Sequence, residues 1–335
     1  MALAARPLAL CVSLGTLLFH TLLNLLMSYI KVGTDDHGKD INVHYCDYGQ
    51  GNPVVLIHGW PLSGASWEYQ LAELPLHGVR VIAYDRRGFG HSSKPWNGYD
   101  YDTFADDLKA VLDTLDLQNV TLVGFSMGGG EVARYMSRHR GARVARVAFV
   151  SAVPPFMLKT DDNPSGVDKS TFDDMITNLG KDRFGFLSDF GKKFYGQGTF
   201  SHPVSQGVLD WTAQLAFPAS PRATSQCVKA FGETDFRQDM PAINVPTLFI
   251  YGSSDDIVPP ETGAKAAAPL VPGAQIVEYD GEPHGLLITA KDRLNRDLLT
   301  FVSGQPVQEY YDANDTDAMP TRQENDPTRY EDQTR

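Results

Sequence analysis

Short, continuous apolar runs alternate along this chain with longer segments in which apolar residues recur at helical spacing. Six of these runs are bounded by Gly, Pro or Asp and have the length of a buried strand: residues 54–57, 79–84, 120–123, 144–150, 246–251 and 275–279. Between them, the spacing of Phe104, Leu108 and Val111, and of Val132 and Met136, predicts helices. Continuous apolar strands separated by helices are typical of a mostly parallel, doubly wound sheet with helices on both faces. The pattern therefore predicts an α/β fold.

Two segments depart from this alternation. Residues 41–48 alternate between apolar and polar positions, which predicts an antiparallel strand at the edge of the sheet. Residues 154–241 contain no clear strand but much Phe, Trp, Gly and Pro, and the segment is too long for a plain connection. We therefore predict a helical cap at about 154–241. Its aromatic side chains either hold the cap together or line a substrate pocket, and the candidates are Phe156, Trp211, Phe217 and Phe231.

Residues 1–26 form an apolar leader, and the apolar run itself extends over residues 8–30. The run is long enough to cross a bilayer core of roughly 30 Å, although His20 and Asn24 weaken it. A signal anchor at 8–30 would associate the protein with a membrane. Translation from Met27 would instead make the protein cytoplasmic, and a cleaved targeting peptide would remove the run. The residues leave these three interpretations open.

The opposite end of the chain, residues 304–335, carries eight acidic residues, three Arg and almost no aliphatic side chains. Such a segment cannot bury enough apolar area to offset the entropy of ordering it. We predict an acidic disordered tail here, which leaves residues 27–303 as the folded domain.

Composition narrows the class of protein. The 335 residues are 42% hydrophobic and 21% charged, close to globular averages, and suffice for one large α/β domain. The 29 Lys and Arg against 41 Asp and Glu give a net charge of −12, which disfavours nucleic acid as a partner. The three cysteines lack the paired spacing of a zinc site or a disulfide framework, so we expect no metal. A homo-oligomer is compatible with this composition.

One motif carries chemistry directly. Gly124-Phe125-Ser126-Met127-Gly128 matches G-x-S-x-G, and it lies between the predicted strand 120–123 and a helical run. In this strand–turn–helix context the serine occupies a sharp turn with its Oγ exposed, and the glycines let neighbouring backbone pass close to it. Ser126 is therefore the candidate nucleophile.

A serine hydroxyl needs a base, and the base needs an orienting acid. In this architecture both follow the serine, on loops at the carboxyl ends of strands. His284 follows the last predicted strand and is the candidate base. The preceding strand ends at two adjacent carboxyl groups, Asp255 and Asp256, and the residue pattern alone does not choose between them.

Acyl transfer also needs two backbone N–H donors for the oxyanion of the intermediate. Met127 supplies one at the start of its helix, where unpaired N–H groups and the helix dipole favour negative charge. The second donor is expected in the loop after residue 57, which reads His58-Gly59-Trp60-Pro61. Trp60 is the candidate because Pro61 has no N–H, and His58 is expected to brace the loop.

These residues and their surroundings resemble the α/β-hydrolases, and within them the cofactor-free haloperoxidases and similar aryl esterases. The resemblance extends from about Met27 to Val302 and is carried by HGWPLSGASWEYQ, YDRRGFGHSSKPW, GYDYDTFADDL, VTLVGFSMGGGEVARY, FGETDFRQDM and YGSSDDIVP. It implies an α/β-hydrolase fold, no cofactor, and Asp255 as the acid, because the family's acid stands two residues before Ile-Val-Pro. Ser253 departs from the Asp that the family usually has there.

The resemblance also implies a reaction. Such enzymes hydrolyse small esters, and many convert a carboxylic acid and hydrogen peroxide into a peracid, which then oxidises halide. Those that form peracids commonly carry a proline directly after the tryptophan that donates to the oxyanion, and this chain has Pro61 directly after Trp60. Its rigid ring could hold the loop carbonyl close to the acyl-enzyme. With Pro61, we expect Phe125 and Trp211 in the substrate pocket or its loops.

The sequence thus predicts a serine hydrolase that acts on a small ester, or on a carboxylic acid plus peroxide. A lactonase or a carbon–carbon bond hydrolase would use the same three residues, because fold and site determine the machinery rather than the substrate. A ligand-binding protein without catalysis is the alternative from another class.

Overall fold

The computed structural model describes residues 28–308, so the predictions for the leader 1–26 and for the tail beyond residue 308 lie outside the described residues. The apolar run at 8–30 overlaps the described part at its end. Tyr29 and Ile30 belong to a strand, and Ile30 is only 2% exposed. The last residues of that run are therefore part of the folded sheet, which corrects the predicted limit of a membrane segment. Within residues 28–308, no helix combines the length and the hydropathy needed to span a membrane.

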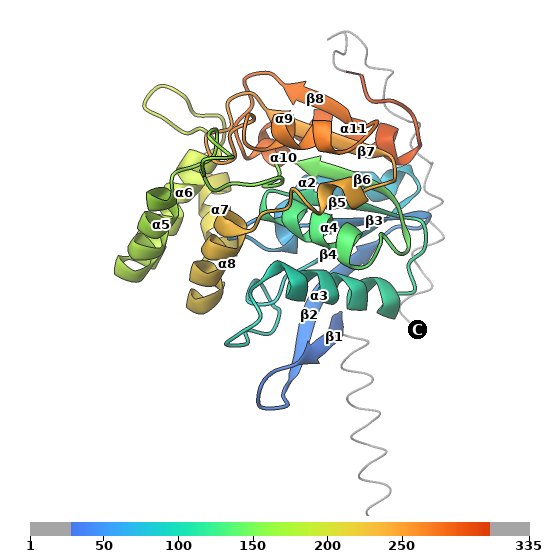
Figure 1. Cartoon of the computed structure of the whole chain (residues 1–335), viewed down its shortest axis with the longest axis horizontal. Coiled ribbons are helices and arrows are strands. Elements are labelled where there is room, and N and C mark those ends of the chain that lie inside the picture. Colours follow the sequence, from blue (N-terminus) through green and yellow to red (C-terminus); the bar gives the residue numbers. More distant parts are fainter. Residues whose placement is uncertain (1–27, 309–335) are drawn as a thin grey trace, which may run out of the picture.

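The described chain forms one eight-stranded sheet in the order β1-β2-β4-β3-β5-β6-β7-β8 (Figure 1). β1 pairs with β2, and β2 with β4, in antiparallel fashion, whereas all pairs from β4 to β8 are parallel. The strands are β1 (Tyr29–Thr34), β2 (Asp40–Tyr48), β3 (Asn52–Ile57), β4 (Val79–Tyr84), β5 (Val120–Phe125), β6 (Val144–Val150), β7 (Thr247–Gly252) and β8 (Gln275–Tyr279).

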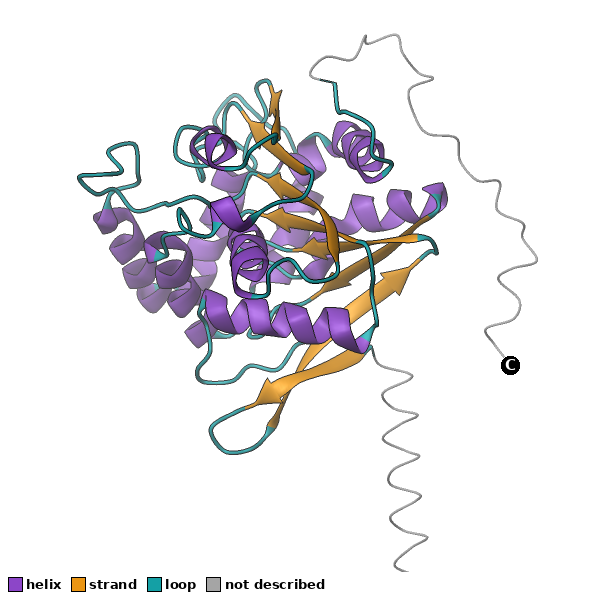
Figure 2. Ribbon diagram, turned by 45° about the vertical axis from the view of Figure 1, so that its right-hand side comes forward, coloured by secondary structure: helices purple, strands orange, loops and turns teal. Residues whose placement is uncertain are grey.

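The six apolar runs predicted as strands are all strands, with ends within two residues of the prediction. Every residue of β5 and β7 is buried, because helices cover both faces of the sheet (Figure 2). The prediction that residues 41–48 form the edge was wrong. They lie in β2, and β1 pairs with the outer side of β2 and takes the edge position.

Two groups of helices accompany the sheet. α3 (Tyr101–Thr114) packs against α4 (Met127–Arg138), and α2 (Glu68–Glu73) contacts both α10 (Leu286–Thr289) and α11 (Lys291–Val302). The apolar positions of α3 that predicted it, Phe104, Leu108 and Val111, are fully buried. The shorter helical segments are η1 (Gly64–Trp67), η2 (Leu74–His77), η3 (Met240–Ala242), α9 (Ala264–Ala267) and η4 (Ala268–Leu270).

Four helices lie between β6 and β7, in the segment where the sequence predicted a helical cap. They are α5 (Lys169–Lys181), α6 (Arg183–Phe194), α7 (Gln206–Ala216) and α8 (Pro221–Glu233), and they form the group at the left of Figure 1. Three begin at a side-chain cap, because Asp182, Ser205 and Ser220 each accept a hydrogen bond from an N–H of the first turn. α5 packs against α6 and α8, and α6 packs against α7.

The turn between β5 and α4 is closely packed against the neighbouring backbone. Ser126 has φ 53° and ψ −121°, in the region that favours glycine, and its N–H donates to the carbonyl of Val150 at 2.9 Å. A Cβ at Gly124 would lie 2.7 Å from the Cα of Gly129, and one at Gly128 would collide with the backbone oxygen of Ile57. The two glycines of the motif are therefore required by close packing of backbone on backbone.

Replacing Gly128 by Ala should destabilise the protein by about 1–3 kcal/mol, because the backbone of β3 must move to admit the methyl group. Gly180→Ala is the matched control. A Cβ at Gly180 meets nothing within 4 Å on α5, and the change should raise stability by about 0.5–1 kcal/mol. Urea unfolding of the full-length variants measures both effects. Equal stability of the two variants would contradict the steric account.

Candidate active site

The structure brings Ser126, His284 and Asp255 together at the carboxyl ends of the parallel strands. Ser126 follows β5, Asp255 follows β7, and His284 follows β8. The Nε2 of His284 lies 3.0 Å from the Oγ of Ser126, and its Nδ1 lies 2.7 Å from Oδ2 of Asp255. The three residues are only 6%, 1% and 3% exposed, respectively. Asp256 is exposed and forms no hydrogen bond with His284 in the described chain, so the geometry selects Asp255 from the two adjacent carboxyl groups.

The loop after β7 orients Asp255. Its Oδ1 accepts hydrogen bonds from the N–H groups of Ile257 at 2.9 Å and Val258 at 2.8 Å, which leaves Oδ2 for His284. A carboxylate only accepts, so the Nδ1 of His284 carries a proton and the Nε2 can accept from the Ser126 hydroxyl. The order of these hydrogen bonds thus sets the tautomer in which His284 could act as a base toward Ser126.

The His284 ring is held from the side by two aromatic rings. Phe125 and Phe194 each have a ring centroid 5.0 Å from that of His284. Phe125 was predicted in the substrate pocket or its loops, but it is fully buried next to His284 and does not line the cavity described below. The prediction was wrong because Phe125 ends β5, whose residues are all buried.

The two predicted oxyanion donors belong to two segments that lie close to Ser126. Met127 is the first residue of α4, so its N–H has no partner within the helix. Trp60 lies in the loop after β3, which passes so close to Ser126 that a Cβ on Gly59 would lie 2.9 Å from the Ser126 Cβ. Pro61, joined to Trp60 by a cis peptide bond, is buried in this loop rather than in the cavity wall. The indole of Trp60 donates to the carbonyl of Thr224 on α8 at 3.1 Å.

A buried polar network fixes the start of the loop after β3, residues 58–61, which carries the proposed donor Trp60 and is called the oxyanion loop below. The backbone N–H of Arg86 donates to the Nε2 of His58 at 2.9 Å, and the Arg86 side chain donates to the His58 carbonyl at 2.9 Å. The Nε of Arg86 also donates to Oε2 of Glu131 on α4 at 2.7 Å. Burial and the nearby Arg86 charge lower the pKa of His58 to about 3, so its ring is neutral and braces the loop, as the sequence suggested.

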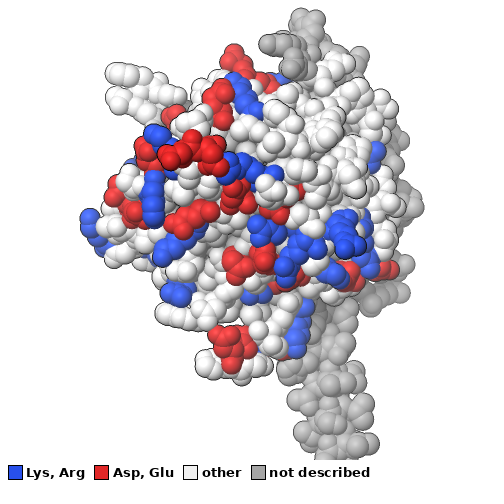
Figure 3. All heavy atoms as spheres, in the orientation of Figure 1, with Lys and Arg blue, Asp and Glu red and all other residues white. Residues whose placement is uncertain are grey.

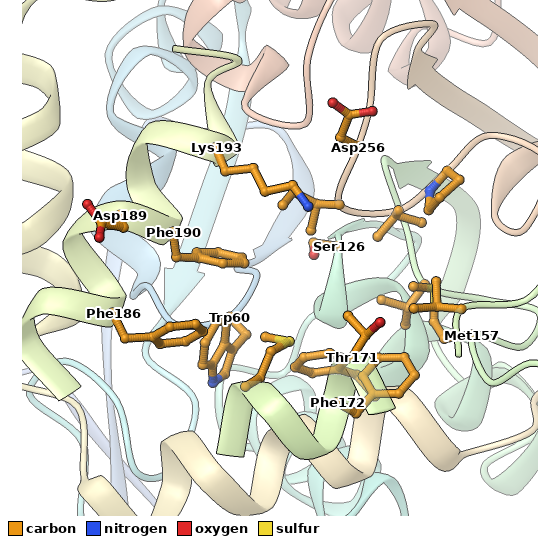
Figure 4. Close-up of a pocket in the computed structure, with 17 residues that line it drawn as sticks. Trp60, Ser126, Met157, Thr171, Phe172, Phe186, Asp189, Phe190, Lys193 and Asp256 are labelled. Carbon is orange, nitrogen blue, oxygen red and sulfur yellow. The ribbon is translucent and has the colours of Figure 1, made fainter. Parts of the chain in front are cut away.

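A cavity of about 520 Å³ opens above Ser126, between the cap and the sheet. Trp60, Phe172, Phe186, Phe190 and Met157 form much of its wall (Figure 4). Phe231 also lines it, as one of the four cap aromatics proposed from the sequence. The charged side chains at this cavity are Asp189, Lys193 and Asp256.

Trp211 was predicted in the pocket, and this was wrong. It belongs to α7 and is half-buried against the core, and within the described chain no residue of α7 lines the cavity. α7 packs against α6 and η1 instead. Phe156 and Phe217 also lie outside the cavity wall. Aromatic composition identified the cap, but not which helix faces would border the cavity.

Sequence reasoning missed two sets of residues at this site. Arg86 and Glu131 form the buried network, and no local pattern reveals a pair 45 positions apart. Phe186, Phe190 and Lys193 recur at spacings of four and three, a signal that would have placed them on one face of a helix. Among the described residues, no group of three or more His, Cys, Asp or Glu side chains is arranged to hold a metal ion.

Comparison with known proteins places this chain in a family. The family model described as alpha/beta hydrolase fold matches residues 52–291. The chain is 42% identical over 265 residues to a non-heme chloroperoxidase from Kitasatospora aureofaciens, with 78% of this chain and 96% of the relative covered. It is 40% identical to a bifunctional esterase/perhydrolase from Acinetobacter calcoaceticus, with 78% and 96% covered.

A solved structure supports the same family assignment. The bromoperoxidase from Bacillus anthracis is 46% identical, and its superposition covers 83% of this chain and 99% of that protein with a TM-score of 0.80. The chain therefore belongs to the α/β-hydrolase fold family, in its group of non-heme haloperoxidases and esterases. The predicted fold and the resemblance stated from the sequence motifs are both confirmed.

The neutral state of His58 makes a prediction about pH. A histidine with a pKa near 6.5 when unfolded and about 3 when folded binds its proton more weakly in the folded state. Its contribution to stability is therefore complete above about pH 6.5 and is lost as the pH falls toward 3, by up to about 1.4 kcal/mol per pH unit.

Urea unfolding of the wild type and of His58→Gln between pH 7.5 and 4.5, a range chosen to bracket this titration, compares the two slopes of stability against pH. We expect a shallower slope for the variant. The slope is the readout, because the substitution also changes the absolute stability. Identical slopes would show that His58 is not a buried neutral group.

Proposed function

We propose that this protein is a serine hydrolase that cleaves small carboxylic esters through an acyl-enzyme. Peracid formation, in which hydrogen peroxide replaces water, is a second reaction of the same acyl-enzyme. The observation that carries the proposal is the hydrogen-bonded series from Ser126, which lines the cavity, through His284 to the buried Asp255. The names of its relatives, which include esterases and a bifunctional esterase/perhydrolase, support it.

In the first half-reaction, the Oγ of Ser126 attacks the ester carbonyl while the Nε2 of His284 takes its proton. Asp255 stabilises the resulting imidazolium and keeps its orientation. The N–H groups of Trp60 and Met127 donate to the oxyanion. When the tetrahedral intermediate collapses, the bond to the alcohol breaks and His284 returns the proton to the leaving alkoxide, which leaves the acyl group on Ser126.

In the second half-reaction, His284 removes a proton from water, and the hydroxyl oxygen attacks the acyl carbonyl. Collapse of this intermediate breaks the bond to Ser126, which recovers its proton, and releases the carboxylic acid. Hydrogen peroxide can replace water in the same step, and the product is then the peracid RC(O)OOH. In the reverse direction, a carboxylic acid can acylate Ser126 with loss of water. Oxidation of halide by the released peracid would be a secondary reaction.

The alternatives stated from the sequence differ from this proposal in substrate or in catalysis. A lactonase or a carbon–carbon bond hydrolase would react with a fluorophosphonate at Ser126 but would not turn over simple esters. A ligand-binding protein would do neither. Fluorophosphonate labelling and ester turnover, measured together, therefore separate the three classes.

Replacing Ser126 by Ala should lower kcat for p-nitrophenyl acetate by roughly 10⁴-fold or more, because the acyl-enzyme can no longer form. Peracetic acid formation from acetate and peroxide should fall in parallel, and fluorophosphonate labelling should be lost. Ser201→Ala, at an exposed serine of the cap, is the matched control and should leave all three unchanged. Turnover retained in Ser126→Ala would refute the proposed nucleophile.

Replacing Pro61 by Leu should lower the ratio of perhydrolysis to hydrolysis. Pro61 follows the oxyanion residue Trp60, in a turn closed by a hydrogen bond from the Leu62 N–H to the Gly59 carbonyl at 3.1 Å. A more flexible residue should loosen the loop carbonyl that selects peroxide over water at the acyl-enzyme. The two rates are measured on the same preparation with p-nitrophenyl acetate and with acetate plus peroxide. If the ratio of perhydrolysis to hydrolysis equals that of the wild type, Pro61 does not select peroxide over water.

A further inference from the structure

One face of α6 combines aromatic side chains with a positive charge. Phe186, Phe190 and Lys193 follow one another at spacings of four and three residues, and all three line the cavity that contains Ser126. Figure 4 shows the Lys193 side chain extending from α6 into the cavity rather than away from it. The ammonium group is thus carried by the same helix face that supplies part of the apolar wall.

Lys193 has no partner of its own in the described chain, unlike the lysine next to it. The Nζ of Lys192 lies 2.9 Å from Oδ1 of Asp189, which also lines the cavity. Residues 28–308 provide neither an ion pair nor a hydrogen bond for the Lys193 ammonium. Among the cations of the described residues, Lys193 is the one that lines this cavity.

The loop after β7 contributes an opposite charge to the cavity. Asp256 lines the same cavity, is exposed, and has no ion pair within the described part of the chain. In Figure 4, Lys193 and Asp256 lie on one side of Ser126, whereas Trp60, Phe186 and Phe172 lie on the other. Ser126 thus lies between the Lys193–Asp256 side of the cavity and these aromatic rings, whereas the third charged side chain, Asp189, lies near Phe186 and Phe190.

An ester bound at Ser126 extends in both directions from its carbonyl carbon. One substituent lies among the aromatic side chains, where burial of apolar area is favourable. The other extends past Lys193, where a carboxylate can form a charge-assisted hydrogen bond with the ammonium. We propose that Lys193 is a specificity-determining residue and that the preferred substrates are short ester anions, with an apolar group on one side of the ester and a carboxylate on the other.

The rest of the protein surface does not favour anionic esters. The chain has a net charge of −12, which repels anions at long range. Acidic and basic side chains are interspersed on the face seen in Figure 3, rather than gathered in one basic region. Preference for an anionic ester must therefore come from contact inside the cavity, and in the described chain Lys193 is the cation placed to make it.

The inference rests on the proposed esterase function, and the experiment uses pairs of esters that separate the two. One pair is the half benzyl ester of glutaric acid and the benzyl ester in which a methyl ketone replaces its carboxylate. A second pair reverses the ester, with the benzoate ester of γ-hydroxybutyrate and its methyl ketone analogue. The readout is the ratio of kcat/KM for the anionic ester to kcat/KM for its neutral analogue, measured with the full-length protein.

In at least one of the two pairs, Lys193→Met should lower this ratio by about three- to tenfold, the range of a partly solvated ion pair. Lys193→Glu should lower it further, and Lys193→Arg should restore it. Asp256→Asn should raise the ratio, because it removes a negative charge at the cavity that repels the anionic ester. Lys181→Met, at an exposed lysine of the cap helix α5 that does not line the cavity, is the matched control and should leave the ratio unchanged.

Ratios that stay constant in Lys193→Met and Lys193→Glu, while the neutral esters are hydrolysed, would overturn the role of Lys193 and leave the esterase proposal standing. If the wild type showed neither Ser126-dependent labelling nor turnover of any ester, the esterase proposal and the role of Lys193 would both be rejected. If Ser126 is labelled but none of the esters is turned over, protection from labelling by each ester gives the same ratio as a binding measurement. The esterase proposal would then fail, but a difference in protection that depends on Lys193 would still support its role in selecting anionic ligands. Equal protection in the wild type and in Lys193→Met would overturn that role.

Discussion

The backbone of Ser126 is the constraint on which the rest of the site depends. Its positive φ is a conformation that a serine adopts only at a cost of about 1–3 kcal/mol, and surrounding contacts must hold it there. The N–H of Ser126 donates to Val150 on β6, and its carbonyl accepts from Gly129 and Val153. Gly128 brings the first turn of α4 against the end of β3. One strained residue thus ties β3, β5, β6 and α4 together at the point where an oxyanion would form.

The two backbone donors proposed for that oxyanion belong to different segments, so further contacts must hold the two segments in a fixed relative position. Arg86 does this by bonding both the His58 carbonyl, two residues before Trp60, and Glu131, on the same helix as Met127. Tyr101 adds a hydrogen bond to the Met127 carbonyl at 3.1 Å. A buried ion pair has a large desolvation cost and contributes little net stability. Its position between the two donors suits a role in geometry better than a role in stability.

Local sequence signals predicted seven of the eight strands of the described sheet and the residues around Ser126, but not the edge strand β1. The strands are continuous apolar runs because both faces are covered, and the G-x-S-x-G turn and the loop after β8 have chain positions that the architecture dictates. Phe125 and Trp211 were assigned wrongly because composition does not tell which way a side chain points. The partnership of Arg86 with Glu131 depends on tertiary packing alone. The choice of Asp255 over Asp256 came from the resemblance, and in the structure it follows from two N–H groups that hold one oxygen of Asp255.

Adjacent aspartates show how this fold divides chemistry from selectivity. Asp255 is buried and bonded to His284, whereas Asp256, one residue further, is exposed at the cavity. The same division holds at the oxyanion loop, where the Trp60 N–H is the proposed oxyanion donor, whereas its indole lines the cavity and bonds to the cap. The cap helices can therefore change side chains such as Lys193 without touching Ser126, His284 or Asp255. The loops after β3 and β7 are less free to vary, because their cavity residues lie next to residues that hold or carry out the reaction, as Asp256 does next to Asp255, so variation in substrate preference should fall mainly on the cap.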